Sequence, residues 1–164
     1  MPDPPSKKII TRGPASDVAA TSYHITRVRV PLFEVDLGQA VYHGNYFHLF
    51  ETGREDFLRK IGFPYREFMD RKLHLTIVES VCVYRKPLHY DDEIYIHTGI
   101  AWIRRRSLGF SQLIFRCGEG GEKELCTRAD LTMVCVRFTG QAVVLPDDFR
   151  GIVEGLEEKS GSGD

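Results

Sequence analysis

One loop of this sequence combines a carboxylate with the start of a helix. These are two of the groups needed to cleave an ester-like bond at its carbonyl carbon. Asp36 follows a strand-like segment, Gly38 permits a sharp turn, and a helical pattern begins at Tyr46. The first N–H groups of a helix have no intrahelical acceptor, and the helix dipole favours negative charge there. Such donors can hold an oxyanion while the carboxylate attacks the carbonyl or activates a water. Aspartate before a helix is also a common loop or capping residue, so the pattern alone leaves a structural role open.

A second group of residues that could bind a substrate is the basic turn Arg104-Arg105-Arg106-Ser107. An arginine guanidinium matches the geometry of a phosphate, so this turn could hold the phosphates of coenzyme A. A solvated surface turn has the same composition. Nucleic acid is a third candidate, but 22 Lys and Arg against 23 Asp and Glu give a net charge of −1. That balance argues against a general nucleic-acid binder.

The segments around these residues must position them, and their hydrophobic patterns predict an α+β domain. Residues 24–33 alternate and are rich in β-branched side chains, which predicts a strand. The period becomes helical from Tyr46 to Ile61, and after a connecting segment at 65–72 only strand patterns follow, at 75–85, 93–104, 108–117 and 125–138. Short polar turns separate these four strands, so we expect consecutive antiparallel pairing. The predicted fold is a five-stranded antiparallel sheet around one long helix.

The predicted helix has a wide apolar stripe, formed by Tyr46, Leu49, Phe50, Gly53, Phe57 and Ile61. Asn45 is its expected N-cap, Gly62 suits the position after its C-terminus, and Pro64 blocks its continuation. Gly53 would let the helix approach its neighbours closely. We therefore expect this helix to lie across the sheet.

A chain of 164 residues fits one domain, which we place at 23–153 between tails at 1–22 and 154–164. The first tail is rich in proline and small polar residues, and the second is charged and rich in glycine and serine. No apolar run approaches the roughly 18 residues of a membrane span, and no secretion signal is evident. The four cysteines show no CxxC spacing, so we expect reduced thiols, no bound metal and a cytoplasmic location.

The loop and the helix together form a longer motif, which runs Asp36-Leu-Gly-Gln-Ala-Val-Tyr-His-Gly-Asn-Tyr46 and continues to Arg54-Glu55. This motif resembles that of the 4-hydroxybenzoyl-CoA thioesterase family. These proteins are hotdog-fold acyl-CoA thioesterases and include the YbgC-like group. The resemblance extends over residues 24–149, including the closing segment 140–146. It therefore implies a hotdog fold for nearly the whole domain.

The resemblance also implies roles for individual residues. It implies that Asp36 is the catalytic carboxylate, which acts on the thioester carbonyl as nucleophile or general base. It implies that the backbone N–H of His43 polarises that carbonyl, so the main chain of His43 matters more than its imidazole. The substrate-binding residues that it implies are Tyr42, Asn45 and Tyr46 at the acyl pocket, and Arg104, Arg105, Arg106 and Ser107 at the nucleotide end of coenzyme A.

The chain departs from the family's pattern at two places in this loop. Val35 precedes the aspartate where the family has Thr or Cys. Gln39-Ala40 stands where the family has Gly followed by Val or Ile. These differences bear on the geometry of the loop, and therefore on rate and substrate.

Other titratable side chains offer weaker candidates. Another hotdog branch places its catalytic carboxylate on the helix, which makes Glu51 the alternative base. We favour an ion pair between Glu51 and Arg54 or another cation as its role. No catalytic role is predicted for four histidines, because none pairs by spacing with a serine or cysteine: His48, His74, His89 and His97.

Together these observations predict a hydrolase that cleaves the thioester of a fatty or aromatic acyl-CoA, or of an acyl carrier protein. Coenzyme A is part of the substrate, and no other cofactor is expected. The sheet edge or its second face is expected to bury against another copy, giving a dimer or homotetramer. Two alternatives stay open. A hotdog hydratase or dehydratase would use the His43 side chain together with the aspartate, and a non-catalytic acyl-CoA-binding module would explain the departures at Val35, Gln39 and Ala40.

Overall fold

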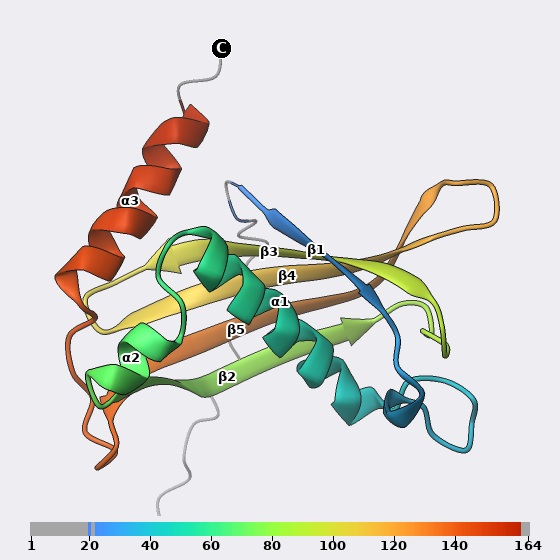
Figure 1. Ribbon diagram of the computed structural model, residues 1–164, viewed down its shortest axis with the longest axis horizontal. Helices are drawn as coiled ribbons and strands as arrows, with labels where there is room; N and C mark the ends of the chain where they lie inside the picture. The colour runs from blue at the N-terminus through green and yellow to red at the C-terminus, as the bar shows by residue number, and fades with distance from the viewer. Residues whose placement is uncertain (1–19, 21, 162–164) are drawn as a thin grey trace, which may run out of the picture.

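The computed structural model describes residue 20 and residues 22–161 of the chain, so the predicted tail at 1–22 lies almost wholly outside the described residues. Short 3-10 turns occupy Leu32–Glu34 and His43–Asn45, before the first long helix. The remaining elements, in chain order, are β1 (His24–Arg29), α1 (Tyr46–Lys60), α2 (Arg66–Asp70), β2 (Leu73–Tyr84), β3 (Glu93–Ile103), β4 (Ser107–Cys117), β5 (Lys123–Arg137) and α3 (Asp147–Gly161). Figure 1 shows α1 lying across one face of the five-stranded sheet. This arrangement confirms the predicted fold class.

The order of strands in the sheet is β1-β3-β4-β5-β2, with every neighbouring pair antiparallel. The predicted consecutive pairing is therefore right for β3, β4 and β5 but wrong for β2, which pairs with β5 at the sheet edge. The connection 85–92 carries the chain past β5 and β4 to β3. The N–H groups of Arg85 and Lys86 both donate to the carbonyl of Cys126 on β5, which fixes the start of this crossing. The crossing covers three strand spacings of about 4.8 Å each, which a connection of eight residues can span.

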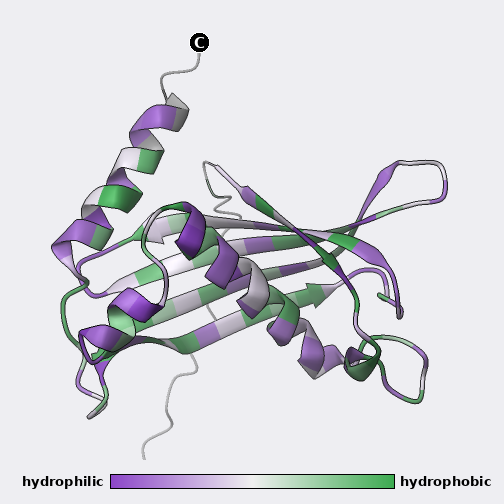
Figure 2. Cartoon of the chain, in the orientation of Figure 1, coloured by the Kyte–Doolittle hydropathy of each residue, from purple (hydrophilic) through white to green (hydrophobic). Residues whose placement is uncertain are grey.

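Helix α1 approaches the sheet closely at Gly53, as the sequence predicted. A Cβ atom there would lie 2.6 Å from Cγ2 of Ile96 and 2.8 Å from Oγ1 of Thr98. Beside it, the Arg54 guanidinium donates to Oε1 of Gln112 at 3.0 Å, and Nε2 of Gln112 donates to the carbonyl of Phe50 at 2.8 Å and to Oγ1 of Thr98 at 2.9 Å. Hydrophobic and hydrophilic positions alternate along α1 in Figure 2, as expected for a helix with one buried face.

Gly53→Ala is expected to lower the free energy of unfolding by about 1–3 kcal/mol, because the added methyl group has no room against Ile96 and Thr98. The matched control is Gly155→Ala on α3, where a Cβ meets nothing within 4 Å. The control removes only the helix penalty of glycine and should stabilise by up to about 1 kcal/mol. Thermal unfolding of both variants measures the difference, and equal melting temperatures would contradict the close packing at Gly53.

Both ends of the predicted helix can be compared with the structure. Gly62 adopts a φ of +83°, the left-handed conformation expected after a helix C-terminus. The connecting segment that follows contains the short helix α2. Helix α3 runs to Gly161, whereas the sequence predicted a tail without regular structure from residue 154. Phe149 and Val153 bury the first turns of α3 against Phe63 and Phe68 of the core, which accounts for the helix.

Two further features of the described residues bear on function. Their helices include none that is long and apolar enough to cross a membrane. All four cysteines are free thiols, with Cys126 and Cys135 buried and Cys117 exposed. Burial raises the pKa of the Cys126 and Cys135 thiols, so both favour the neutral, unreactive form.

Candidate active site

The loop that contains Asp36 is closed by backbone contacts at its base. Val35 and Val41 form an isolated β-bridge, and the N–H of Asp36 donates to the carbonyl of Ala40 at 3.0 Å. Gln39 adopts a φ of +63°, a left-handed conformation that glycine takes more readily. Gln39, which stands where the family has glycine, therefore does not prevent the loop from closing. Its left-handed backbone conformation costs about 1 kcal/mol.

The Asp36 carboxylate lies at the surface of the protein, in an open cavity of about 590 Å³. Its Oδ1 atom accepts the N–H of Gly38 at 2.7 Å, which fixes the orientation of the carboxylate. A Cβ at position 38 would lie 2.9 Å from that oxygen, so a larger residue there would displace the carboxylate from this position. Within the described part of the chain, Oδ2 has no hydrogen-bond partner. One carboxylate oxygen is thus held by the loop, and the other is available to a substrate or a water.

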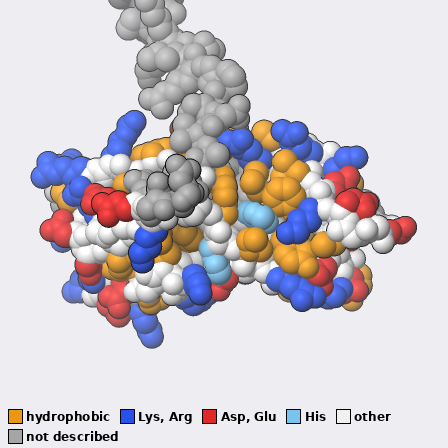
Figure 3. Space-filling view, turned by 90° about the horizontal axis from the view of Figure 1, so that it is seen from above, with side chains coloured by type: hydrophobic (Ala, Val, Ile, Leu, Met, Phe, Trp, Pro, Cys, Tyr) orange, Lys and Arg blue, Asp and Glu red, His pale blue; other side chains and the backbone are white. Residues whose placement is uncertain are grey.

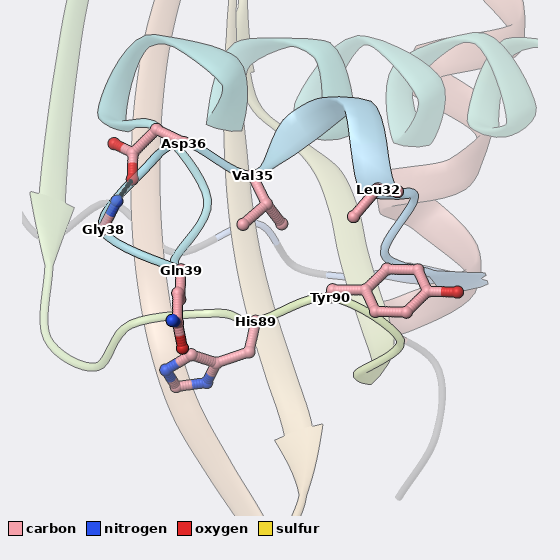
Figure 4. Close-up of a pocket in the computed structure, with 7 residues that line it drawn as sticks. All are labelled: Leu32, Val35, Asp36, Gly38, Gln39, His89 and Tyr90. Atoms are coloured by element: carbon pink, nitrogen blue, oxygen red, sulfur yellow. Dashed lines mark hydrogen bonds between the residues drawn. The ribbon is translucent and has the colours of Figure 1, made fainter.

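Two residues that no sequence pattern indicated share this cavity, as Figure 4 shows. His89 and Tyr90 reach it from the connection between β2 and β3, more than fifty positions along the chain from Asp36. The backbone N–H of His89 donates to a carboxylate oxygen of Asp92 at 2.8 Å, which holds this connection in place. The full lining of the cavity is Leu32, Val35, Asp36, Gly38, Gln39, His89 and Tyr90.

The start of α1 presents unused hydrogen-bond donors. The N–H groups of His43 and Gly44 have no acceptor among the described residues, because they open the 3-10 turn that leads into the helix. The carbonyl of His43 accepts the hydroxyl of Tyr84 on β2 at 2.8 Å, and the carbonyl of Tyr42 accepts the N–H of Asn45 at 2.8 Å. The peptide group that carries the His43 N–H is therefore fixed at the carbonyl of Tyr42, and the one that carries the Gly44 N–H is fixed at the carbonyl of His43. Their free N–H groups have the chemistry to hold a developing oxyanion.

Asn45 does not act as the side-chain N-cap that the sequence predicted. It immediately precedes α1, but its own backbone is already helical and its side chain makes no capping bond. Its Nδ2 atom instead donates to the carbonyl of Glu34 at 3.1 Å, and the N–H of Tyr42 donates to the same carbonyl at 3.0 Å. Asn45 therefore ties the helix start to the Asp36 loop.

The two tyrosines of the motif do not line the Asp36 cavity. Tyr46 is 3% exposed and packs in the core beneath α1, where its hydroxyl accepts the N–H of Leu88 at 3.1 Å. Burial raises the pKa of Tyr46, so this hydroxyl stays protonated. Tyr42 is exposed and its ring lies tilted against the His43 ring, with 4.2 Å between ring centroids. The role at the acyl pocket that the resemblance implied for them stays a prediction.

Glu51 lines a different cavity, of about 580 Å³, between α1, α2 and β2. The predicted ion pair of Glu51 with Arg54 or another cation is not among the ion pairs of the described residues. The Arg54 side chain turns inward instead, where it donates to Gln112, and burial lowers its pKa. The cavity mixes apolar and polar side chains: Glu51, Arg54, Glu55, Leu58, Tyr65, Met69, His74, Leu75, Thr76, Ile77, Phe110 and Met133.

The basic turn connects β3 to β4, and its three arginines are exposed. Backbone bonds hold it in place: the carbonyls of Arg105 and Arg106 accept the N–H groups of Leu145 and Cys135 at 3.0 and 2.9 Å. In the described part of the chain no carboxylate pairs with these arginines, so their charges are available to an anion. The view in Figure 3 shows Lys and Arg interspersed with Asp and Glu, without one extended basic surface.

The basic turn and Asp36 lie at opposite ends of the sheet in one chain (Figure 1). The Asp36 cavity includes His89 and Tyr90, just before the first residue of β3, and Arg104 follows the last. An eleven-residue strand is about 36 Å long at about 3.3 Å per residue. The structure thus ties the Asp36 loop to the helix start through the carbonyl of Glu34 and places the predicted nucleotide site at the other end of the sheet.

Comparisons with known proteins show the family of the chain. A model of the thioesterase-like superfamily matches residues 30–153. A provisionally named esterase of Aquifex aeolicus is 33% identical over 124 residues, which cover 76% of this chain and 92% of that protein. The acyl-CoA thioesterase YbgC of Haemophilus influenzae is 24% identical over 110 residues, covering 66% and 77% of the two chains.

Solved structures show the same fold. The DHNA-CoA thioesterase of Staphylococcus aureus superposes with a TM-score of 0.78 at 24% identity, covering 87% of this chain and 95% of that one. The 4-hydroxybenzoyl CoA thioesterase of Pseudomonas sp. strain CBS-3 has a TM-score of 0.72 at 24% identity, covering 80% and 99%. At this level of identity the likeness concerns the fold alone.

Proposed function

The chain belongs to the thioesterase-like superfamily, and from this membership we propose that it hydrolyses the thioester bond of an acyl-CoA. The observation that carries the proposal is the Asp36 carboxylate in an open cavity, on a loop tied to a helix start with two unused N–H groups. Water adds to the acyl carbon, and the C–S bond breaks. The products are a carboxylic acid and free coenzyme A.

The roles of the groups follow from their chemistry. Asp36 attacks the thioester carbonyl, or removes a proton from the attacking water. The N–H of His43 holds the oxygen on which negative charge develops. This N–H stays oriented because the carbonyl of the same peptide group, that of Tyr42, accepts the N–H of Asn45. The scheme assigns the nucleophile or base to Asp36 and the oxyanion donors to the backbone, so it includes no metal or redox cofactor. Free thiols inside the sheet fit a reducing compartment, so we place the reaction in the cytoplasm.

The separation of Asp36 from the basic turn supports a site shared between two copies of the chain. Strand β2 is a twelve-residue sheet edge with exposed apolar side chains, including Val78, Val81 and Val83. Such an edge is suited to pairing with another strand. If two β2 strands pair antiparallel about their middles, the Tyr84 end of one lies beside the His74 end of the other.

That pairing would place the catalytic groups of one copy near the binding groups of its partner. Tyr84 contacts the helix start beside the Asp36 loop, whereas His74 lines the 580 Å³ cavity at the other end of β2. The basic turn lies at that same other end of the sheet. We therefore propose a dimer, or a tetramer built from such dimers. The acyl group, fatty or aromatic, would occupy the cavity beside α1, and the coenzyme A phosphates would contact Arg104 to Arg106.

Release of free thiol from a panel of short, long and aromatic acyl-CoAs tests this function. We expect turnover of at least one class, with the corresponding acyl carrier protein thioesters measured in parallel. Binding of acyl-CoAs without thiol release over the whole panel would contradict the proposal and favour a non-catalytic module. Hydration of an unsaturated acyl-CoA without thiol release would favour a hydratase.

The double variant Arg105→Ala/Arg106→Ala is expected to raise KM for acyl-CoA by about tenfold for each phosphate that no longer has an arginine partner, with little change in kcat. Hydrolysis of the corresponding acyl-pantetheine, which lacks the nucleotide, should not change. The effect should shrink in high salt, because these side chains are exposed. The matched control is Lys60→Ala/Arg66→Ala, which removes two exposed charges elsewhere. Equal KM increases for both substrates would contradict a nucleotide site at this turn.

A further inference from the structure

A buried carboxylate lies two residues before Asp36, and the scheme above does not use it. The Glu34 side chain is 4% exposed, within an otherwise apolar segment. Its two oxygens lie 3.2 and 3.0 Å from one atom, Nδ1 of His48 on the first turns of α1. The His48 side chain is itself 63% exposed. A single histidine at the surface thus provides the partner for a carboxylate in the interior.

We propose that the Glu34–His48 pair positions Asp36 relative to the N–H groups at the start of α1, an inference that rests on the proposed function. The carbonyl of Glu34 accepts the N–H of Tyr42 and the side-chain amide of Asn45. One residue therefore contacts the turn before α1 through its backbone and α1 itself through its carboxylate. These contacts join the loop that carries the carboxylate to the element that carries the oxyanion donors.

The pair acts on Asp36 rather than on the substrate. Neither Glu34 nor His48 lines the Asp36 cavity, so both are positioning residues. A buried carboxylate that loses its partner is strongly destabilised and moves toward water. Because Val35 alone separates Glu34 from Asp36, that movement would displace the catalytic carboxylate. A displacement of about 1 Å can cost a hundredfold in rate.

Five variants of the full-length chain test this role, with kcat, KM and thermal unfolding measured for each: His48→Ala, His48→Asn, Glu34→Gln, the double variant Glu34→Gln/His48→Ala, and the control Arg59→Ala. His48→Ala should lower kcat by about tenfold or more and change KM little. His48→Asn should restore most of kcat, because its side-chain N–H can take the place of Nδ1–H. In a Glu34→Gln background, His48→Ala should cost less, because no buried charge is left unpaired. Arg59→Ala breaks the exposed Glu55–Arg59 pair further along α1 and should keep the parent kcat.

The outcomes separate this inference from the proposed function. Parent activity that is lost in Asp36→Asn but unchanged in His48→Ala overturns the inference alone. So does an equal loss of kcat from His48→Ala in both backgrounds, or a failure of His48→Asn to recover activity. If His48→Ala is unfolded at the assay temperature, His48→Asn and the double variant Glu34→Gln/His48→Ala still test the inference. A parent protein that releases no thiol from any acyl-CoA removes the proposed function and the inference with it.

Discussion

Asp36→Asn is expected to lower kcat for thioester hydrolysis by about 10²–10⁴-fold and to leave the fold intact. The amide keeps the size of the carboxylate, and its oxygen can still accept the N–H of Gly38. It cannot form a covalent intermediate of comparable reactivity, and it cannot accept a proton from water. Because Asp36 is exposed and makes no ion pair among the described residues, stability should change by less than about 0.5 kcal/mol. Thiol release and thermal unfolding measure the two effects.

Asp70→Asn is the control for this variant, because Asp70 is exposed at the end of α2 and far from the loop in the chain. It should retain full activity. If Asp36→Asn stays within threefold of the parent, the assignment of Asp36 is wrong. Glu51→Gln then becomes the decisive variant, since Glu51 is the alternative base and lines the other cavity. Activity lost only in Glu51→Gln would assign the role of catalytic base to Glu51 on α1.

The sequence predicted the elements of the fold better than their arrangement. Helix α1 was predictable because its apolar stripe, Gly53 and the glycine at its C-terminus are all local features. The place of β2 at the sheet edge was not. An alternating pattern shows which face of a strand is buried but not which strand lies beside it. The ladder between β2 and β5 and the bonds from Arg85 and Lys86 to Cys126 show that the chain crosses the sheet to reach β3.

The candidate site divides in the same way. Asp36 and the helix start were predictable because they lie within one loop. His89 shares the Asp36 cavity although it lies more than fifty positions away in the sequence. Glu34 pairs with His48 across the loop and the start of α1, and the spacing of these two residues does not predict a contact. The predicted Glu51–Arg54 pair has suitable helical spacing, but burial of Arg54 against Gln112 prevented it. The catalytic role of Asp36 and the nucleotide role of the basic turn stay predictions.

Val81→Lys/Val83→Lys is expected to separate the proposed dimer and to lower kcat/KM by about a hundredfold. Both side chains are exposed on the β2 edge, so the lysines disturb a single chain little. In a symmetric pairing of two β2 strands, however, four like charges would face one another. The activity should fall because each Asp36 would lose the basic turn and cavity of its partner. Sedimentation velocity gives the mass, and thiol release at low acyl-CoA concentration gives kcat/KM.

Mixing two variants that are each impaired at low acyl-CoA concentration tests the shared site without breaking the dimer. One chain carries Asp36→Asn, and the other carries Arg105→Ala/Arg106→Ala. In a mixed dimer one site receives Asp36 from the second chain and the arginines from the first, so it is intact. Random exchange at equal amounts should therefore recover about one quarter of the parent sites, assayed well below the parent KM. Simple averaging of the two variants, with no gain after subunit exchange, would mean that each chain uses its own basic turn. Loss of the dimer in the lysine variant with full activity would exclude the shared site in the same way.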